Sequence, residues 1–309
     1  MKVLIAGGSG FIGQNLSFYF SKKKNCFTVS SYFKNKPQLK FKNIKYEKID
    51  FRSKKNCIKF VKSFDLIVIC AGYVFNQSLV NKKNIDKKIQ DHLKINQNIL
   101  DACKVNKIKK VIYLSSALGY PFSKFRLSED DFFKGKVPNR YFAVGNMYRF
   151  LEKYLNNLKL NFVILRPGEI YGEFDNFNIN SANSITKYLS YFILRRKKKI
   201  FVTNELVSKK SFLYVGDLCK VICFFANKKK QYNTSFNISN THPNNLLFVI
   251  KIIEKVIKQK ILKIESKDKL KKYYRALSTK KISKVLKKKI NSNFQINIKR
   301  TIKFLIKNY

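Results

Sequence analysis

Short apolar runs alternate with longer amphipathic stretches through the first half of the chain. The apolar runs predict strands, because each is nearly continuous in β-forming residues and most end at Gly, Ser, Asp or Arg-Pro. These predicted strands cover 3–6, 27–31, 44–49, 66–71, 111–114 and 162–165. The stretches between them predict helices over 14–21, 85–105 and 141–158. This alternation predicts an α/β fold of the Rossmann type, with a doubly wound parallel sheet.

The pattern changes after Gly172. Residues 175–183 are polar and Asn-rich, which indicates a loop, and 185–196 are patterned like a helix. Beyond them, strand and helix signals alternate irregularly to residue 309. We expect a dinucleotide-binding Rossmann domain over 1–172. We expect 173–309 to form mainly a smaller α/β substrate-binding lobe, with the chain crossing back to the Rossmann domain around 200–235.

Lysine accounts for most of the positive charge, and the lysines are spread along the whole chain. Lys+Arg is 65 and Asp+Glu is 18, so the formal net charge is +47. A charge this large favours nucleic acid or an anionic membrane as a partner. The lysines run from Lys2 to Lys307, however, and Lys, Ile, Asn and Phe share AT-rich codons, so composition bias explains the charge. Because no basic helix carries base-reading side chains, we expect no specific nucleic-acid partner.

The cysteines and the apolar runs argue against a metalloprotein and against a membrane-spanning protein. None of the six Cys forms a C-x-x-C pair and His occurs only twice, so we expect no metal site. Cys70 and Cys223 lie in apolar runs, which is typical of reduced core thiols. No apolar run approaches the roughly 18 residues that span a bilayer. We therefore expect a cytoplasmic location and no membrane insertion.

A glycine-rich turn follows the first predicted strand and opens the first helix. Its sequence is Gly7-Gly8-Ser9-Gly10-Phe11-Ile12-Gly13. Gly7 permits the tight turn, Gly10 removes a side chain where a pyrophosphate approaches, and Gly13 lets the helix pack against the strand. Because the pattern stands between a strand and a helix, it predicts a dinucleotide site rather than an ordinary turn.

The ends of the next strands indicate which dinucleotide binds. Ser30-Ser31 end the second strand and Lys34 follows, where NAD-binding proteins usually place an acidic residue. Ser31 and Lys34 favour a 2′-phosphate, so we expect NADP, with NAD left open. Asp50-Phe51, after the third strand, is placed to touch the adenine edge. Ala71-Gly72, after the fourth, lets the backbone approach the cofactor.

Four further segments carry a family resemblance. They are Tyr113-Leu-Ser-Ser-Ala-Leu-Gly-Tyr-Pro121, Arg166-Pro-Gly-Glu-Ile-Tyr-Gly172, Asp175-Asn-Phe-Asn-Ile-Asn-Ser-Ala-Asn183 and Ser211-Phe-Leu-Tyr-Val-Gly-Asp217. Together with the glycine turn, they resemble the extended short-chain dehydrogenase/reductase family of NAD(P)-dependent sugar-nucleotide epimerases and dehydratases over essentially the whole chain. Within that family, the Asp-Asn-Phe element is most similar to the GDP-L-fucose synthase subgroup.

The resemblance implies a catalytic tyrosine and serine. Tyr141 matches the tyrosine that exchanges a proton with the sugar oxygen, and Ser116, with Ser115 as the fallback, matches the serine that holds that oxygen. The family lysine four residues after the tyrosine is Gly145 here. That lysine holds the ribose and lowers the phenol pKa through its charge. We therefore expect weakened catalysis, and activity that rises when Gly145 is replaced by Lys.

Other positions keep or depart from the subgroup pattern. Leu118 and Asn183 stand where the subgroup has the Cys and His of 3,5-epimerisation, and neither transfers a proton at neutral pH. Glu169 replaces a common Asn. The resemblance implies that Asn183, Lys210 and Arg275 face the substrate. It implies cofactor contacts at Gly7, Ser9, Gly10, Phe11, Ile12, Gly13, Ser31, Lys34, Asp50, Phe51, Ala71, Gly72, Ser115, Tyr141, Pro167 and Ile170.

These features favour an enzyme that reduces the 4-keto group of a nucleotide-activated sugar with NADP and does not epimerise it. The family implies a homodimer formed through the two long helices after the fourth and fifth strands. An NAD-dependent epimerase or dehydratase of the same fold is one alternative. A catalytically silent protein that binds the cofactor or the sugar nucleotide is another, and the missing lysine is its main support.

Overall fold

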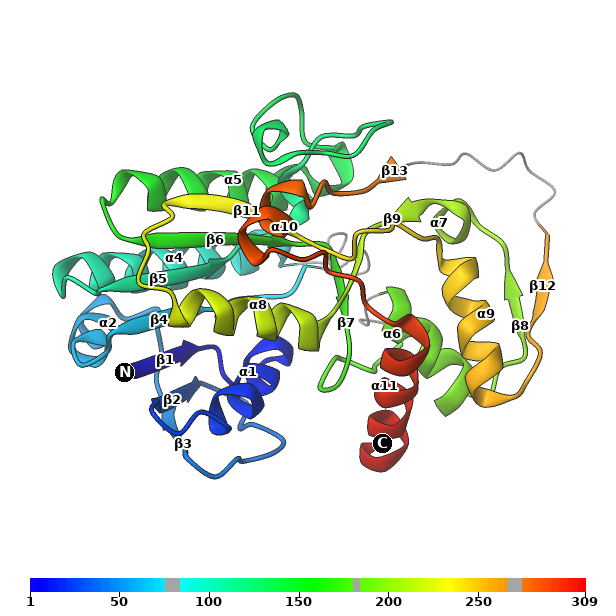
Figure 1. Ribbon diagram of the computed structural model, residues 1–309, viewed down its shortest axis with the longest axis horizontal. Helices are drawn as coiled ribbons and strands as arrows, with labels where there is room; N and C mark the ends of the chain where they lie inside the picture. Colours follow the sequence, from blue (N-terminus) through cyan, green and yellow to red (C-terminus); the bar gives the residue numbers. More distant parts are fainter. Residues whose placement is uncertain (76–83, 180–183, 266–273) are drawn as a thin grey trace. The chain divides into compact units, whose positions relative to one another are not determined.

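The computed structural model describes residues 1–75, 84–179, 184–265 and 274–309. The chain divides into two units. Unit 1 comprises residues 1–119, 137–166 and 218–236, and unit 2 comprises residues 120–136, 167–217 and 237–309. The chain thus returns to each unit more than once, as the colours in Figure 1 make visible.

A seven-stranded sheet runs through unit 1 in the order β11-β6-β5-β4-β1-β2-β3. The strands are β1 (Lys2–Ala6), β2 (Phe27–Tyr32), β3 (Ile44–Lys48), β4 (Leu66–Ile69), β5 (Lys110–Leu114), β6 (Phe162–Pro167) and β11 (Thr234–Ile238). The six strands from β6 to β3 are parallel. β1 pairs with both β2 and β4, so the strand order reverses beside β1. A doubly wound sheet binds its ligand at such a reversal, and the predicted fold class is confirmed.

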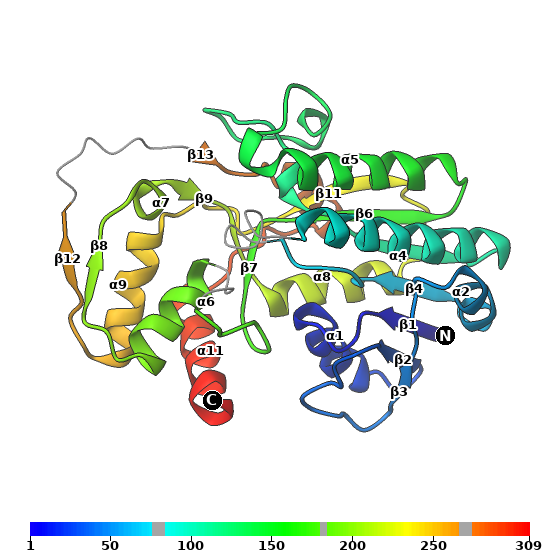
Figure 2. The same ribbon diagram turned by 180° about the vertical axis from the view of Figure 1, so that it is seen from behind.

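Helices cover both faces of this sheet, with α4 beside α5 and α8 beside α1 (Figures 1 and 2). The helices are α1 (Phe11–Ser21), α2 (Lys54–Val61), α4 (Ile85–Val105), α5 (Phe142–Asn157) and α8 (Val215–Asn227), with short 3₁₀ turns η1 (Ala117–Gly119) and η3 (Asn139–Tyr141). Central strands β1 and β4 are buried because apolar runs leave no polar face. No helix in the described part of the chain is long and apolar enough to span a membrane.

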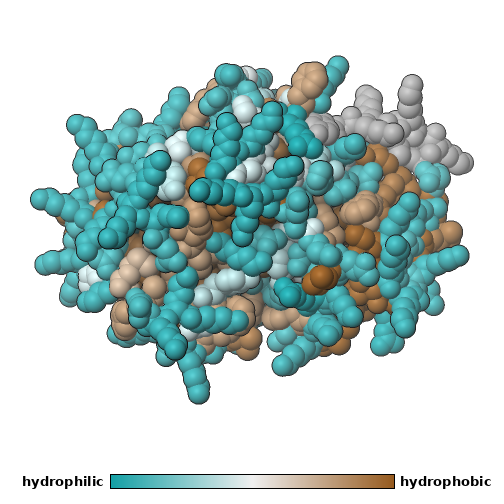
Figure 3. Space-filling model, in the orientation of Figure 1, coloured by the Kyte–Doolittle hydropathy of each residue, from teal (hydrophilic) through white to brown (hydrophobic). Residues whose placement is uncertain are grey.

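A buried lysine joins the sheet to the end of α8. Lys110 begins β5 and is 8% exposed. Its ammonium donates hydrogen bonds to the carbonyl oxygens of Phe225, at 3.1 Å, and of Lys228. A cation placed there satisfies the last carbonyls of the helix and complements its dipole. Most other lysines lie at the surface, and hydrophilic side chains cover much of the face drawn in Figure 3.

Unit 2 combines short parallel strand pairs with helices. The pairs are β7 (Glu169–Tyr171) with β10 (Phe212–Tyr214), β8 (Lys199–Phe201) with β12 (Leu262–Ile264), and β9 (Lys209–Lys210) with β13 (Tyr274–Arg275). The helical segments are η2 (Glu129–Asp131), α6 (Ser184–Leu189), the π-helical η4 (Ser190–Leu194), α7 (Asn204–Val207), α9 (Leu246–Ile257), α10 (Lys280–Leu286) and α11 (Phe294–Asn308). The apolar faces of α9 and α11 supply much of the core of this unit.

Candidate active site

The turn between β1 and α1 contains contacts that only glycine permits. Gly7 has φ 91°, and a Cβ there would lie 2.7 Å from the Cα of Ala71. A Cβ on Gly13 would lie 2.2 Å from the carbonyl oxygen of Gly7, so α1 starts directly against the turn. At Gly10 the nearest atom to such a Cβ is 3.3 Å away. The fold therefore requires Gly7 and Gly13, and constrains Gly10 less tightly.

The first turn of α1 presents backbone N–H groups that can hold an anion. Amides at a helix start lack partners within the helix. Among the described residues, no acceptor lies within hydrogen-bond distance of the amides of Phe11, Ile12 and Gly13. The first turn carries no acidic side chain, Ser9 before it is half-buried, and Gly10 is exposed. This cradle fits a dinucleotide pyrophosphate.

Ser31 lies beneath the turn rather than at the open end of β2. Both Ser30 and Ser31 are fully buried. The Ser31 hydroxyl donates to the carbonyl of Ile5 at 3.2 Å and accepts the N–H of Gly7 at 3.1 Å. The Ser31 hydroxyl therefore holds the glycine turn, and its expected contact with a 2′-phosphate stays a prediction. Lys34, beyond the end of β2, is exposed.

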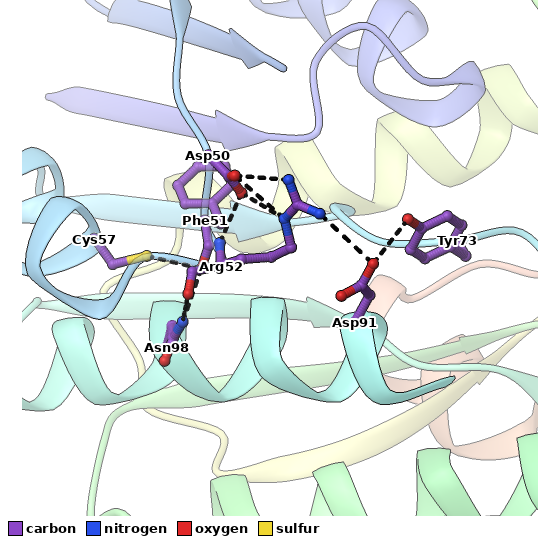
Figure 4. Close-up of polar contacts among 7 residues, drawn as sticks. All are labelled: Asp50, Phe51, Arg52, Cys57, Tyr73, Asp91 and Asn98. Carbon is purple, nitrogen blue, oxygen red and sulfur yellow. Dashed lines mark hydrogen bonds and ion pairs between the residues drawn. The ribbon is translucent and has the colours of Figure 1, made fainter. Parts of the chain in front are cut away.

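The loop after β3 offers an acceptor and a donor side by side. Arg52 holds the Asp50 carboxylate and lowers the pKa of that group by hydrogen bonding and charge. The Phe51 carbonyl accepts hydrogen bonds from Asn98, at 3.0 Å, and from the Cys57 thiol, at 3.2 Å (Figure 4). No acceptor for the Phe51 N–H lies within the described residues. A carboxylate beside an N–H matches the amino group and ring nitrogen of adenine, as Asp50-Phe51 was expected to do.

The loop after β4 is fixed by α4. The Ala71 carbonyl accepts a hydrogen bond from the Asn96 amide at 3.3 Å. Gly72 has φ 136°, and a Cβ there would lie 2.4 Å from Nδ1 of His92. The Tyr73 N–H donates to that same nitrogen at 3.1 Å. Burial lowers the pKa of His92 to about 4, so the ring is neutral and accepts this bond.

Ser115 and Ser116, after β5, have different environments. The Ser115 hydroxyl donates to Glu152 at 2.5 Å, and Glu152 forms a paired contact with the Arg166 guanidinium at 2.6–3.1 Å. All three side chains are buried. Ser116 is half-buried and accepts the Leu118 N–H at 3.2 Å, which leaves its own proton to donate. Ser116 is therefore the hydroxyl that can hold a substrate oxygen, and the fallback Ser115 is engaged elsewhere.

Tyr141 ends η3 directly before α5 and is 5% exposed. The Arg140 guanidinium lies over its ring, 4.9 Å from the centroid. Helix α5 packs against η1, which follows Ser116. The structure thus brings the segments that carry Ser116 and Tyr141 together within unit 1.

Close packing explains why position 145 has no lysine. A Cβ on Gly145 would lie 2.6 Å from the carbonyl oxygen of Leu118 and 2.6 Å from Cγ1 of Val137. The loop after β5 therefore occupies the space a side chain would need. This contradicts the expectation that lysine at 145 restores a family feature, because the backbone of η1 closes that place.

The substrate-side residues belong to unit 2. Lys210 is buried, and its ammonium lies 2.9 Å from Glu205 and 3.5 Å from Glu169. Two carboxylates thus offset the charge of Lys210, and the expectation that Lys210 faces the substrate stays a prediction. Arg275 lies in β13. Pro167 and Ile170, which were expected to contact the cofactor, lie at the end of β6 and in β7. Asn183 lies outside the described residues.

The sequence profile of the NAD dependent epimerase/dehydratase family matches residues 3–239. The chain belongs to this family. GDP-L-colitose synthase of Yersinia pseudotuberculosis is 22% identical over 268 residues, covering 83% of this chain and 82% of that protein. The match confirms the family resemblance drawn from the glycine turn and the Arg-Pro element.

Solved structures of the family share the fold over the full chain. UDP-N-acetylglucosamine 4-epimerase from Methanobrevibacter ruminantium M1 superimposes with a TM-score of 0.84 at 20% identity, covering 100% of this chain and 99% of that one. UDP-glucuronic acid 4-epimerase from Bacillus cereus, in complex with UDP-glucuronic acid and NAD, gives a TM-score of 0.84 at 19% identity, covering 100% of both chains. At these identities the likeness establishes the fold.

Sequence reasoning missed two charged residues at this site. Arg52 carries a signal that could have been found, because it is one of only nine arginines in a lysine-rich chain and follows Asp50 by two positions. Glu152 carries a weaker signal. It is an acidic residue on the apolar stripe of α5, and only the fold shows that Arg166 and Ser115 meet it.

Proposed function

We propose that the chain is an NADP-dependent reductase that acts on the 4-keto group of a nucleotide-activated sugar without 3,5-epimerisation. The observation that carries this proposal is the packing of α5 on η1, which places the Tyr141 and Ser116 segments together in the unit that holds the glycine turn. Membership of the epimerase/dehydratase family supports the substrate class.

The residues present fit a dinucleotide. The first-turn amides of α1 would hold the pyrophosphate, and Asp50 with the Phe51 N–H would receive the adenine. When bound, the cofactor supplies a hydride to the sugar carbon. Tyr141 donates the proton to the carbonyl oxygen, and the Ser116 hydroxyl holds that oxygen by a hydrogen bond. The hydride adds to the carbonyl carbon and the proton to its oxygen, so the 4-keto group becomes a hydroxyl.

The epimerisation step lacks its proton carriers. Leu118 has an apolar side chain, and an Asn at 183 neither gives nor takes a proton at neutral pH. With no acid/base pair at these positions, the sugar keeps its configuration at the neighbouring carbons. The product is therefore the 4-hydroxy sugar alone.

Arg275 is proposed to contact the sugar nucleotide, Pro167 and Ile170 are proposed to contact the cofactor, and the protein is proposed to act in the cytoplasm. We also place a homodimer contact on α4 and α5. Phe142 and Phe150 on α5 are 51% and 47% exposed, which leaves apolar surface for a second copy. Light scattering of Phe150→Asp against the parent tests this contact, and a monomeric parent overturns it.

A second function is supported by Gly145. Without the cationic lysine the Tyr141 phenol ionises less readily, and the loss of such an electrostatic contribution costs about 10²–10³ in rate. A protein that binds cofactor and sugar nucleotide without turning them over fits this feature. An NAD-dependent epimerase or dehydratase also fits the family match.

One experiment separates these functions. Purified protein is mixed with NADPH and a 4-keto-6-deoxy sugar nucleotide, and loss of NADPH absorbance is followed. We expect consumption by the parent and by Tyr154→Phe, a matched change on the same helix. We expect the rate of NADPH consumption to fall at least about 10²-fold in Tyr141→Phe and by a smaller factor in Ser116→Ala. No consumption by a parent that binds NADPH favours the silent protein.

A further inference from the structure

The guanidinium of Arg52 is held in one orientation. Its Nε and one terminal nitrogen donate to both oxygens of Asp50 at 2.8–3.2 Å, and the Arg52 N–H donates to Asp50 at 3.0 Å. Figure 4 shows the guanidinium between the carboxylates of Asp50 and Asp91. A paired contact of this kind fixes the plane of the guanidinium as well as its position.

This guanidinium lies at the end of β2. It sits over the Phe33 ring, 5.0 Å from the centroid, and Phe33 directly follows β2. Lys34 comes next and is exposed. Dinucleotide-binding folds discriminate between NAD and NADP at the end of this strand, because the adenosine ribose lies there. The buried Ser31 leaves that role open, and Arg52 reaches the place from the loop after β3.

The outer edge of the guanidinium keeps donors for a ligand. The nitrogen that faces Asp91 lies 3.7 Å from its carboxylate, too far for a hydrogen bond. Asp91 has its own donor in the Tyr73 hydroxyl, at 3.2 Å. Within the described residues, the hydrogen bonds of the Arg52 guanidinium involve only its Nε and one terminal nitrogen. The side chain is 33% exposed, so an anion can reach this edge.

We propose that Arg52 binds the 2′-phosphate of NADP and is the residue that selects NADP over NAD. Asp50 orients the guanidinium, Phe33 supports it, and its outer N–H groups receive the phosphate oxygens, as an arginine fork suits. Asp91 opposes the phosphate by its charge and so limits the selectivity. This inference rests on the proposed function, because it assumes that a dinucleotide occupies the glycine turn.

The test compares two probes that differ only by the phosphate. Adenosine 5′-monophosphate and adenosine 2′,5′-bisphosphate are titrated calorimetrically into the parent, Arg52→Gln, Arg52→Lys and Asp91→Asn, and NADH and NADPH are titrated in parallel. We expect the parent to bind the bisphosphate at least about tenfold more tightly, the effect of one charge-assisted hydrogen bond. Arg52→Gln should remove most of that ratio and change NADH affinity by less than about threefold. Arg52→Lys should keep part of the preference for the bisphosphate over the monophosphate, and Asp91→Asn should increase that preference.

Several results would overturn the inference. If the parent binds the bisphosphate and the monophosphate equally tightly, no residue selects the phosphate. If Arg52→Gln keeps the parent's preference for the bisphosphate, another residue selects it. Equal weakening of both probes in Arg52→Gln shows that Arg52 acts only by holding Asp50 for adenine. Thermal melting confirms that each variant is folded. A parent that binds NADH but shows no ratio defeats this inference alone, whereas a parent that binds neither dinucleotide defeats the proposed function.

Discussion

Replacing Gly145 by Ala sets two effects of opposite sign against each other. Helix propensity alone predicts that Ala stabilises α5 by about 1 kcal/mol, because Gly is a poor helix former. The structure predicts the reverse. The new Cβ would lie 2.6 Å from the Leu118 carbonyl oxygen and 2.6 Å from Cγ1 of Val137, well inside the 3.4 Å at which ordinary contact begins.

The clash outweighs the propensity. Overpacking in a closed site costs about 1–3 kcal/mol, and here one of the two neighbours is backbone, which cannot rotate away. We therefore expect Gly145→Ala to be destabilised by about 1–2 kcal/mol, which for a chain of 309 residues is roughly 1.5–3 °C in Tm. Gly145→Lys should lose more stability, because its longer side chain must also pass between Leu118 and Val137. It should not gain reductase activity.

Thermal and urea unfolding of both variants measure this. Ala143→Lys, an exposed position on the same helix, is the matched control and should melt within about 1 °C of the parent. Gly145→Ala melting above the parent would show that propensity wins and that η1 yields. A stable Gly145→Lys with raised activity would show that the site accepts the lysine, and would refute the packing argument.

Three other predictions concern charge and burial. Lys110→Met should lower the unfolding free energy by about 1–3 kcal/mol, because the carbonyl of Phe225 loses one of its two donors and that of Lys228 loses the ammonium; thermal melting measures this loss, and an unchanged Tm contradicts it. His92 binds its proton only below pH about 4 when folded but near 6.5 when unfolded, so stability should fall by up to about 3 kcal/mol as pH drops through that window. His92→Asn should remove this slope in urea titrations, and an equal slope in both would contradict the assignment. Duplex DNA should bind weakly, with no sequence preference and a steep salt dependence in fluorescence anisotropy, and a selective complex at physiological salt would contradict the composition argument.

The long periodic segments were predictable because their pattern decides their structure. The helix expected over 85–105 occurs as α4 (Ile85–Val105), and the strand expected over 27–31 occurs as β2, one residue longer. The first helix was expected from residue 14 but starts at Phe11, because the close contact of Gly13 with the turn lets the helix begin there. Over 185–196 the helical pattern was correct, but α6 passes into a π-helical turn at Ser190, which side-chain periodicity does not reveal.

Site chemistry was predictable only where it follows from chain order. The glycine turn and Asp50 follow their strands directly, so the sequence places them. The burial of Ser31, the pairing of Lys210 with Glu205 and the closure of position 145 depend on contacts between segments far apart in sequence. Spacing along one chain carries no information on such contacts, so the sequence alone could not show the surroundings of these three positions.

Hydride transfer to a sugar is the central claim, and isotope tracing measures it directly. The protein is incubated with NADPH that carries deuterium at the transferred position and with a 4-keto-6-deoxy sugar nucleotide, and the product is analysed by mass spectrometry. The account predicts a 4-hydroxy sugar nucleotide with a single deuterium at C4 from the parent, and almost none from Tyr141→Phe. A parent that retains NADPH but leaves the keto sugar unlabelled and unreduced would contradict it.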